Sequence, residues 1–282
     1  MAPLTIASTV KLSSGEVMPR IGYGAYRANG SGVYEALKAG YRLVDTAQFY
    51  DNEDQCGRAI LQFLAETGTS RASVFYTTKL WQQCTTSYAA AARGIDGSLK
   101  RAGLSYADLF LIHSPPRSRT ARLETWRALQ DAVKAGKIRS IGVSNYGVHH
   151  LQELLDWDGL EVHPAVNQVE VHPWLPRKDI VEFCAANNIV VEAYSPLTRG
   201  VRFGDALLAD IVTAHGGAIT PAQVLIRWSM QKGHVPIPKS SNPDRIRSNI
   251  DVFNFALSDA EMAMLDLDSY APVTWDPTIS PL

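Results

Sequence analysis

Short runs rich in β-branched and aromatic residues recur along the chain and predict eight strands. Between these runs, apolar residues recur at helical spacing and would form one buried face, as at Tyr88, Ala91, Ala92, Ile95 and Leu99. Strands and helices therefore alternate throughout the sequence. In chain order the eight runs are IGYGAY, RLVDTA, SVFYTTKL, DLFLIHS, IRSIGVSN, AVNQVEV, VVEAYS and HVPIPKS.

Local signals mark additional elements near both ends of the chain. Residues 220–223 supply an N-cap threonine, a first-turn proline and a capping-box glutamine, and residues 258–261 repeat the box. We expect two helices between the seventh and eighth strands and one after the eighth. Before the first strand, VKLSSGEVMPR predicts a small hairpin that turns at residues 13–15 and would cap the bottom of a barrel.

Eight strand–helix units can close into a barrel or open as a doubly wound sheet, because helices cover parallel strands in both. A dinucleotide fingerprint would favour the open sheet, but residues 22–27, GYGAYR, fail the GxGxxG pattern at its last position. No composition shift marks a linker, and barrels of about 250 residues commonly form one domain. The sequence predicts an α/β protein in which residues 1–282 form a single (β/α)8 TIM barrel with an N-terminal β-hairpin cap and extra helices.

Composition narrows the class of partner. The chain carries 27 basic and 28 acidic residues, so it has no net field to attract nucleic acid or an anionic membrane. Its three cysteines, Cys56, Cys84 and Cys184, are far apart and indicate neither a disulfide framework nor a zinc site. No apolar run approaches the roughly 20 residues of a membrane helix. We expect a cytoplasmic protein with a small-molecule partner, present as a monomer or weak homo-oligomer.

Polar residues lie at or near the ends of seven of the eight runs, where barrel enzymes place their chemistry. Each has a structural explanation when taken alone: His113 would be a satisfied core histidine, and Lys79 an exposed strand end. Their joint occurrence at successive strand ends favours function. The residues are Asp45, Lys79, His113, Ser144, Asn145, Gln168, Tyr194, Ser195 and Lys239.

The stretch DTAQFYDNE at residues 45–53 resembles the signature of the aldo-keto reductase family. The segments TTKLW, LIHSP, GVSN, AYSPL and IPKSSNPDRIRSN follow in the order that this family has them, so the resemblance covers nearly the whole chain. It implies NADPH-dependent reduction of an aldehyde or ketone to an alcohol.

Carbonyl reduction needs a hydride at carbon and a proton at oxygen. Tyr50 can donate the proton as general acid, and a nearby Lys79 ammonium would lower its pKa. Asp45 would pair with the lysine and keep it protonated. His113, as a neutral imidazole, can donate a hydrogen bond to the carbonyl oxygen. The resemblance assigns the same roles to these four residues.

The chain shows no flavin or redox-metal pattern of its own, so a bound nicotinamide must carry the hydride. The resemblance implies that three residues bond its carboxamide, that Tyr194 stacks on its ring and that Ser195, Leu197 and Arg199 follow its pyrophosphate. After the eighth strand, Asn242 and Pro243 begin a helix whose free N–H groups suit an anion. The carboxamide residues are Ser144, Asn145 and Gln168, and those near the helix start are Lys239, Ser240, Arg245 and Asn249.

Departures from the family bear on the substrate. Ser114 stands where many relatives have tryptophan, and both the segment at residues 197–210 and the C-terminal tail are short. We therefore expect an open site that accepts bulky aromatic or secondary-metabolite carbonyls beside simple aldehydes.

Two alternative functions are a regulatory barrel and a metal-dependent hydrolase. A cofactor-binding regulatory barrel subunit without significant turnover would not need the intact set of Tyr50, Lys79, His113 and Asp45. A metal-dependent barrel hydrolase would need clustered ligands, yet His149 and His150 begin a helix and His172 stands alone.

Overall fold

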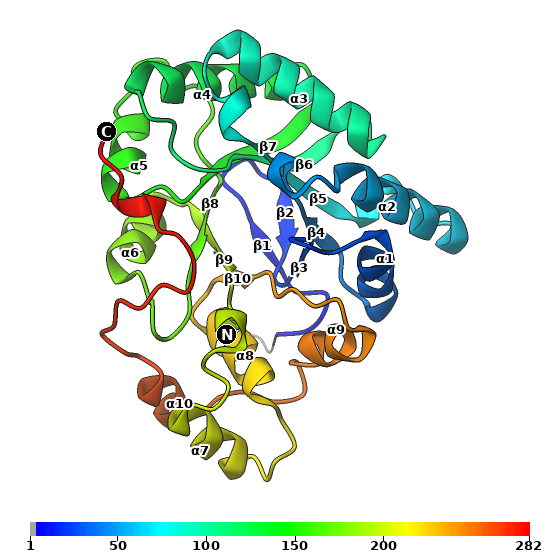
Figure 1. Cartoon of the computed structure of the whole chain (residues 1–282), viewed down its shortest axis with the longest axis vertical. Helices are drawn as coiled ribbons and strands as arrows, with labels where there is room; N and C mark the ends of the chain where they lie inside the picture. The colour runs from blue at the N-terminus through cyan, green and yellow to red at the C-terminus, as the bar shows by residue number, and fades with distance from the viewer. Residues whose placement is uncertain (1–3) are drawn as a thin grey trace.

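The computed structural model describes residues 4–282 and contains one eight-stranded parallel sheet surrounded by helices (Figure 1). Neighbouring strands pair in chain order, from β3 to β10, as expected when each helix returns the chain to the next strand. All eight predicted strands are present. They are β3 (Tyr23–Gly24), β4 (Leu43–Asp45), β5 (Phe75–Leu80), β6 (Ala107–Ile112), β7 (Ile138–Ser144), β8 (Val166–Glu170), β9 (Val190–Tyr194) and β10 (Val235–Pro236).

The first and last strands close the sheet into a barrel. Pro236 and Pro238 have no N–H, but their carbonyls accept hydrogen bonds from Gly22 N at 3.0 Å and Gly24 N at 3.1 Å. A Cβ on Gly24 would lie 2.8 Å from the Ile237 carbonyl oxygen, so the strands can approach this closely only without a side chain. The glycines of the GYG sequence thus serve barrel closure, and the predicted (β/α)8 barrel is confirmed.

The predicted hairpin is present as β1 (Thr9–Lys11) and β2 (Val17–Pro19), and Gly15 takes the left-handed turn position with φ 93°. Leu12 and Met18 from the hairpin pack against Leu43, Phe75 and other residues at the starts of barrel strands. The hairpin therefore covers the amino-terminal end of the barrel, which leaves the carboxyl ends of the strands for a pocket.

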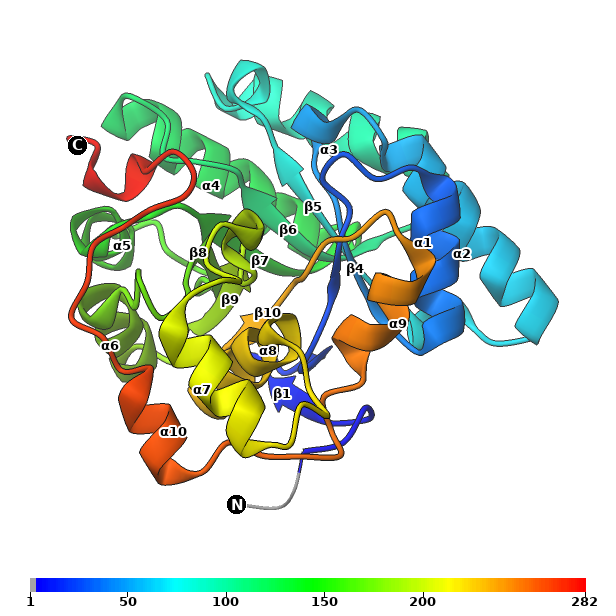
Figure 2. The ribbon, with the colours of Figure 1, turned by 60° about the horizontal axis from the view of Figure 1, so that its bottom comes forward.

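Helices cover the outside of the barrel, and Figure 2 shows α9 beside α1. Their starts follow the sequence signals: Ser87, Thr220 and Asn242 each accept a backbone N–H as N-caps. The helices are α1 (Gly30–Ala39), α2 (Glu53–Thr67), α3 (Tyr88–Ala102), α4 (Arg119–Lys134), α5 (Val148–Leu155), α6 (Lys178–Ala186), α7 (Ala206–Ala214), α8 (Pro221–Gln231), α9 (Pro243–Ile250) and α10 (Asp259–Met264).

Two helices, α7 and α8, lie between β9 and β10 as predicted. The expectation of one helix after the last strand is wrong, because the starts at Asn242 and Ser258 belong to separate helices, α9 and α10. Their N-cap residues lie sixteen positions apart, and α9 already ends at Ile250. Within residues 4–282, no helix is long and apolar enough to span a bilayer.

Candidate active site

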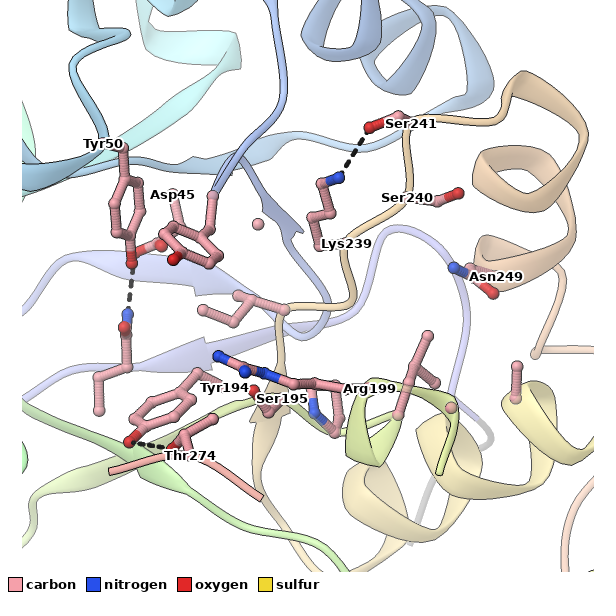
Figure 3. A pocket seen from close by; sticks show the side chains of 18 of the residues that line it. Asp45, Tyr50, Tyr194, Ser195, Arg199, Lys239, Ser240, Ser241, Asn249 and Thr274 are labelled. Atoms are coloured by element: carbon pink, nitrogen blue, oxygen red, sulfur yellow. Dashed lines mark hydrogen bonds between the residues drawn. The ribbon is translucent and has the colours of Figure 1, made fainter. Parts of the chain in front are cut away.

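A cavity of about 1110 Å³ opens at the carboxyl ends of the strands. Figure 3 shows part of its lining, with Tyr50 and Asp45 at one side and Lys239 to Ser241 at the other. Every predicted site residue except Lys79 lines this cavity, so the strand ends do converge on one mouth. The lining residues from the prediction are Asp45, Tyr50, His113, Ser144, Asn145, Gln168, Tyr194, Ser195, Leu197, Lys239, Ser240, Arg245 and Asn249.

Lys79 lies immediately behind the cavity wall and is fully buried. Its Nζ donates to both oxygens of Asp45, at 2.7 and 2.8 Å, and to the Thr46 carbonyl at 2.8 Å. Burial lowers the pKa of Lys79, but the charges of Asp45 and Tyr50 and the hydrogen bond to Asp45 outweigh burial and raise it overall. The ammonium therefore stays charged. The same nitrogen also contacts the Tyr50 hydroxyl.

Tyr50 ends the short 3-10 helix η1 (Gln48–Tyr50), which follows β4 and carries the ring over the pocket. Its hydroxyl lies 3.4 Å from Lys79 Nζ. Burial raises the pKa of Tyr50 to about 12, and Lys79 only partly opposes this rise. The expectation of a pKa below the ordinary value of tyrosine is therefore wrong here, because loss of solvent around the hydroxyl outweighs one nearby ammonium. Tyr50 is protonated throughout the neutral range.

His113 lies beside this pair at the end of β6, with its ring 5.6 Å from that of Tyr50. Burial, with a smaller effect of the Lys79 charge, lowers the pKa of His113 well below its ordinary value. The imidazole is therefore neutral at pH 7. No group among residues 4–282 hydrogen-bonds to its buried Nδ1, so the interior offers this ring no competing partner.

Amide and hydroxyl groups from β7 to β9 form the adjoining wall. Asn145, in the left-handed conformation with φ 61°, donates from Nδ2 to the His113 carbonyl at 2.9 Å and accepts from the Tyr194 hydroxyl at 2.8 Å. Ser144 Oγ donates to the Gln168 carbonyl at 2.8 Å. Gln168 Nε2 donates to two carboxyls, and no group in the described part of the chain donates to its Oε1. These hydrogen bonds fix the orientation of the three side chains at the pocket.

The far end of the cavity is basic. Lys239 Nζ donates to Ser241 Oγ at 2.7 Å, and burial together with the charges of Arg245 and Arg27 lowers the pKa of Lys239. Asn242 Oδ1 caps α9 by accepting from Arg245 N at 3.0 Å. Arg245 itself forms no salt bridge within residues 4–282. Several positive groups thus face one another at a helix N-terminus, an arrangement that attracts an anion.

Sequence reasoning missed most of the aromatic wall. The rings of Phe49 and Trp81 stack at 4.2 Å, Trp275 lies 6.3 Å from Trp81, and Tyr26 meets Tyr50 edge-on at 5.1 Å. Trp81 was detectable because it comes directly after the β5 strand end. Ser114, by contrast, is buried, and its short side chain does not reach the cavity.

The C-terminal tail reaches the pocket through a buried acid. Glu170, the last residue of β8, accepts hydrogen bonds from Val273 N, Thr274 N and Thr274 Oγ1, and His172 Nε2 lies 2.8 Å from its Oε1. Arg177 pairs with Asp276 a little further along. These contacts hold Trp275 at the mouth. Among residues 4–282, no group of three or more His, Cys, Asp or Glu side chains is placed to hold a metal ion.

Comparison with known families decides the class. A model of the Aldo/keto reductase family matches residues 25–267. This chain belongs to the aldo/keto reductase family. Members of the family are oxidoreductases that use nicotinamide cofactors and reduce carbonyl compounds, and the sequence resemblance to the family is confirmed.

Individual relatives cover nearly the whole chain. An uncharacterized oxidoreductase from Schizosaccharomyces pombe is 43% identical over 98% of this chain and 100% of its own length. The glyoxal reductase of Bacillus subtilis is 41% identical over 94% of both. Among solved structures, an aldo-keto reductase of Bombyx mori in complex with NADP is 33% identical over 93% of both chains, with a TM-score of 0.86.

Proposed function

We propose that this enzyme reduces an aldehyde or ketone with NADPH, and that Tyr50 donates the proton to the carbonyl oxygen. The observation that carries the proposal is the Tyr50 hydroxyl, protonated at neutral pH, between the pocket and the Lys79–Asp45 pair. A structural ion pair alone would not explain a neutral imidazole and a tyrosine hydroxyl directed at the same cavity.

The lining residues suit a nicotinamide cofactor, which supplies the hydride when bound. Gln168 Oε1 has an acceptor site free toward the pocket, as a carboxamide NH2 requires. Ser144 and Asn145 stand beside it, and the Tyr194 ring lines the same wall. The basic end at Lys239 and Arg245 provides a place for a phosphate. Both ends of the cavity thus match the two ends of such a molecule.

The residues of the chain would share the remaining chemistry. His113 donates a hydrogen bond that positions the carbonyl oxygen. As negative charge develops on that oxygen, Tyr50 transfers its proton, because a forming alkoxide is far more basic than a phenolate with a pKa of about 12. Lys79, held by Asp45, stabilises the tyrosinate that remains.

We infer a cytoplasmic setting for this reaction. Cys56, Cys84 and Cys184 all lie in the described part of the chain and form no disulfide, as is usual in a reducing compartment.

NADPH should be preferred strongly over NADH, because the two differ only in a 2'-phosphate that the basic end can bind. Arg245 offers a planar guanidinium for two parallel hydrogen bonds, and the start of α9 offers free N–H groups. Charge-assisted hydrogen bonds contribute about 1.5 to 3 kcal/mol each, so Arg245→Ala should weaken NADPH binding at least about tenfold. Titration of both cofactors by quenching of protein fluorescence measures this.

NADH affinity should change little in the same variant. Arg247→Ala is the matched control, since Arg247 lies on the same helix but pairs with Asp244. Equal losses for both cofactors in Arg245→Ala would show that this segment does not bind the phosphate.

The aromatic wall predicts the order of substrates. Aromatic aldehydes should have a higher kcat/KM than aliphatic aldehydes of equal reactivity, because Phe49, Trp81 and Trp275 offer stacking faces worth about 0.5 to 1.5 kcal/mol per ring pair. NADPH oxidation, followed by absorbance across a size-graded carbonyl series, tests the activity and this order together. Cofactor binding without turnover of any carbonyl would favour a regulatory barrel instead.

A further inference from the structure

Glu192 is a buried carboxyl that none of the assigned roles uses. It lies in the middle of β9, in register with Gln168 of β8 and Val235 of β10. Its side chain is fully buried inside the barrel, and its Oε2 accepts a 2.6 Å hydrogen bond from Gln168 Nε2. Its Oε1 is buried and has no partner among residues 4–282. Burying a carboxyl costs free energy unless the group is hydrogen-bonded, paired or neutralised.

The same amide nitrogen joins Glu192 to the proposed proton donor. Gln168 Nε2 also donates to Asp45 Oδ2 at 2.8 Å, and Asp45 binds Lys79, which reaches Tyr50. Gln168 has two N–H groups, and these two carboxyls use both of them. Its Oε1 is thereby directed away from the carboxyls, toward the cavity that Gln168 lines.

We propose that Glu192 is a positioning residue of the reducing site: it holds the Gln168 amide so that Oε1 faces the nicotinamide pocket, and it keeps the buried cluster neutral by carrying a proton. The positioning role rests on the function proposed above, because that function gives Gln168 a nicotinamide carboxamide to bind. The proton on Glu192 is a property of the folded protein and does not depend on that function.

Charge balance within the barrel supports the protonated form. The titratable groups that face Glu192 are Asp45 from β4, Lys79 from β5 and, further off, Tyr50 from η1, while β10 contributes the apolar Val235. Two carboxyls thus share one ammonium. Burial raises the pKa of Glu192 to about 8, the Asp45 charge adds to the rise, and the Gln168 hydrogen bond and Lys79 oppose it. With Glu192 protonated, Asp45 and Lys79 cancel.

Ionisation of Glu192 would act on the proton donor. A negative charge at this position raises the pKa of Tyr50, after the larger effects of burial, Lys79 and Asp45. Tyr50 then becomes a weaker acid. The rate of carbonyl reduction should therefore fall several-fold as the pH rises from 7 to 9. Glu192→Gln, which cannot ionise, should lose this alkaline limb.

Two substitutions separate the hydrogen bond from the charge. Glu192→Leu removes the acceptor for the second N–H of Gln168, so the dissociation constant of NADPH should rise about tenfold. Glu192→Gln keeps an acceptor oxygen at the same place and should restore binding to within about threefold of the wild-type value. Fluorescence titration measures both constants without any turnover.

Thermal unfolding gives a readout that needs no cofactor. Because the pKa of Glu192 is raised from its ordinary 4.5, its contribution to stability is fully present below about pH 4.5 and is lost as the pH rises to about 8. Glu192→Gln lacks this loss. The melting temperature of the Gln variant relative to the wild type should therefore increase between pH 5 and pH 8.

Asp108→Asn is the matched control. Asp108 is also a buried carboxyl, but it lies at the amino-terminal end of β6 and pairs with Arg71. This variant should lower the melting temperature while leaving NADPH affinity and the alkaline limb in place. Equal NADPH affinity of Glu192→Leu and wild type would overturn the positioning role. The proposal that Glu192 carries a proton would be contradicted by an alkaline limb shared by wild type and Glu192→Gln. A difference in melting temperature that does not depend on pH would contradict it too. Wild-type enzyme that reduces no carbonyl would contradict the proposed function alone, since binding and melting still test Glu192.

Discussion

Tyr50→Phe should lower kcat for carbonyl reduction by on the order of 10² to 10⁴-fold, the range that general acid catalysis contributes. The substitution removes only the hydroxyl that faces Lys79, because a phenylalanine ring can keep the edge-on contacts with Tyr26 and His113. Folding and NADPH affinity should therefore stay close to those of the wild type. Steady-state kinetics with an aromatic aldehyde measures the loss of kcat, and cofactor titration measures NADPH affinity separately.

Tyr26→Phe tests whether the loss is specific to the acidic hydroxyl. Tyr26 lines the same cavity and contacts the Tyr50 ring, but its hydroxyl is not bonded to the lysine. Its removal should cost less than tenfold. Near-wild-type turnover by Tyr50→Phe, or equal losses in the two variants, would remove the proton-donor assignment.

The position of the site could be predicted from the sequence because strand ends are visible in it. Asp45, Lys79 and His113 each end an apolar run, and barrel closure brings such ends to one rim. The approach of Lys79 to Asp45 follows from the same rule, since β4 and β5 are neighbours. The local pattern of apolar runs that end in polar residues was enough to predict this part of the site.

The acidity of Tyr50 could not be predicted in the same way. The sequence shows a lysine that must come near, but it does not show how much solvent the pocket removes from the hydroxyl. Burial and charge act in opposite directions on this group, and their balance is a property of the folded barrel. The predicted direction of the net pKa shift of Tyr50 was therefore wrong, although Lys79 does lower this pKa as expected.

Strand register and long-range contacts of the C-terminal tail decide the parts of the site that sequence reasoning missed. Glu192 is visible as an acid inside the run VVEAYS, but its partner depends on the pairing of β9 with β8. Trp275 enters the pocket because Glu170 and Arg177, about a hundred residues earlier, hold the tail. Contacts of this range are not encoded in any local pattern.

Lys79→Met should lower both stability and turnover, since Lys79 is fully buried and is the only cation bonded to Asp45 among the described residues. Removing one member of a buried ion pair leaves the other charge uncompensated and costs about 3 to 5 kcal/mol. Urea unfolding at pH 7 should show this loss. Asp45 would then prefer its protonated form, so the stability of the variant should recover as the pH falls.

The double variant Asp45→Asn/Lys79→Met separates the two effects. With no carboxylate left unpaired, it should regain most of the unfolding free energy that Lys79→Met loses. Turnover should stay low in both variants, because neither supplies a positive charge to stabilise the tyrosinate that Tyr50 forms as it gives up its proton. A stable double variant with wild-type kcat would mean that the ion pair serves only the fold. A stable double variant that binds NADPH but reduces carbonyls on the order of a hundredfold more slowly would assign Lys79 to catalysis rather than to packing.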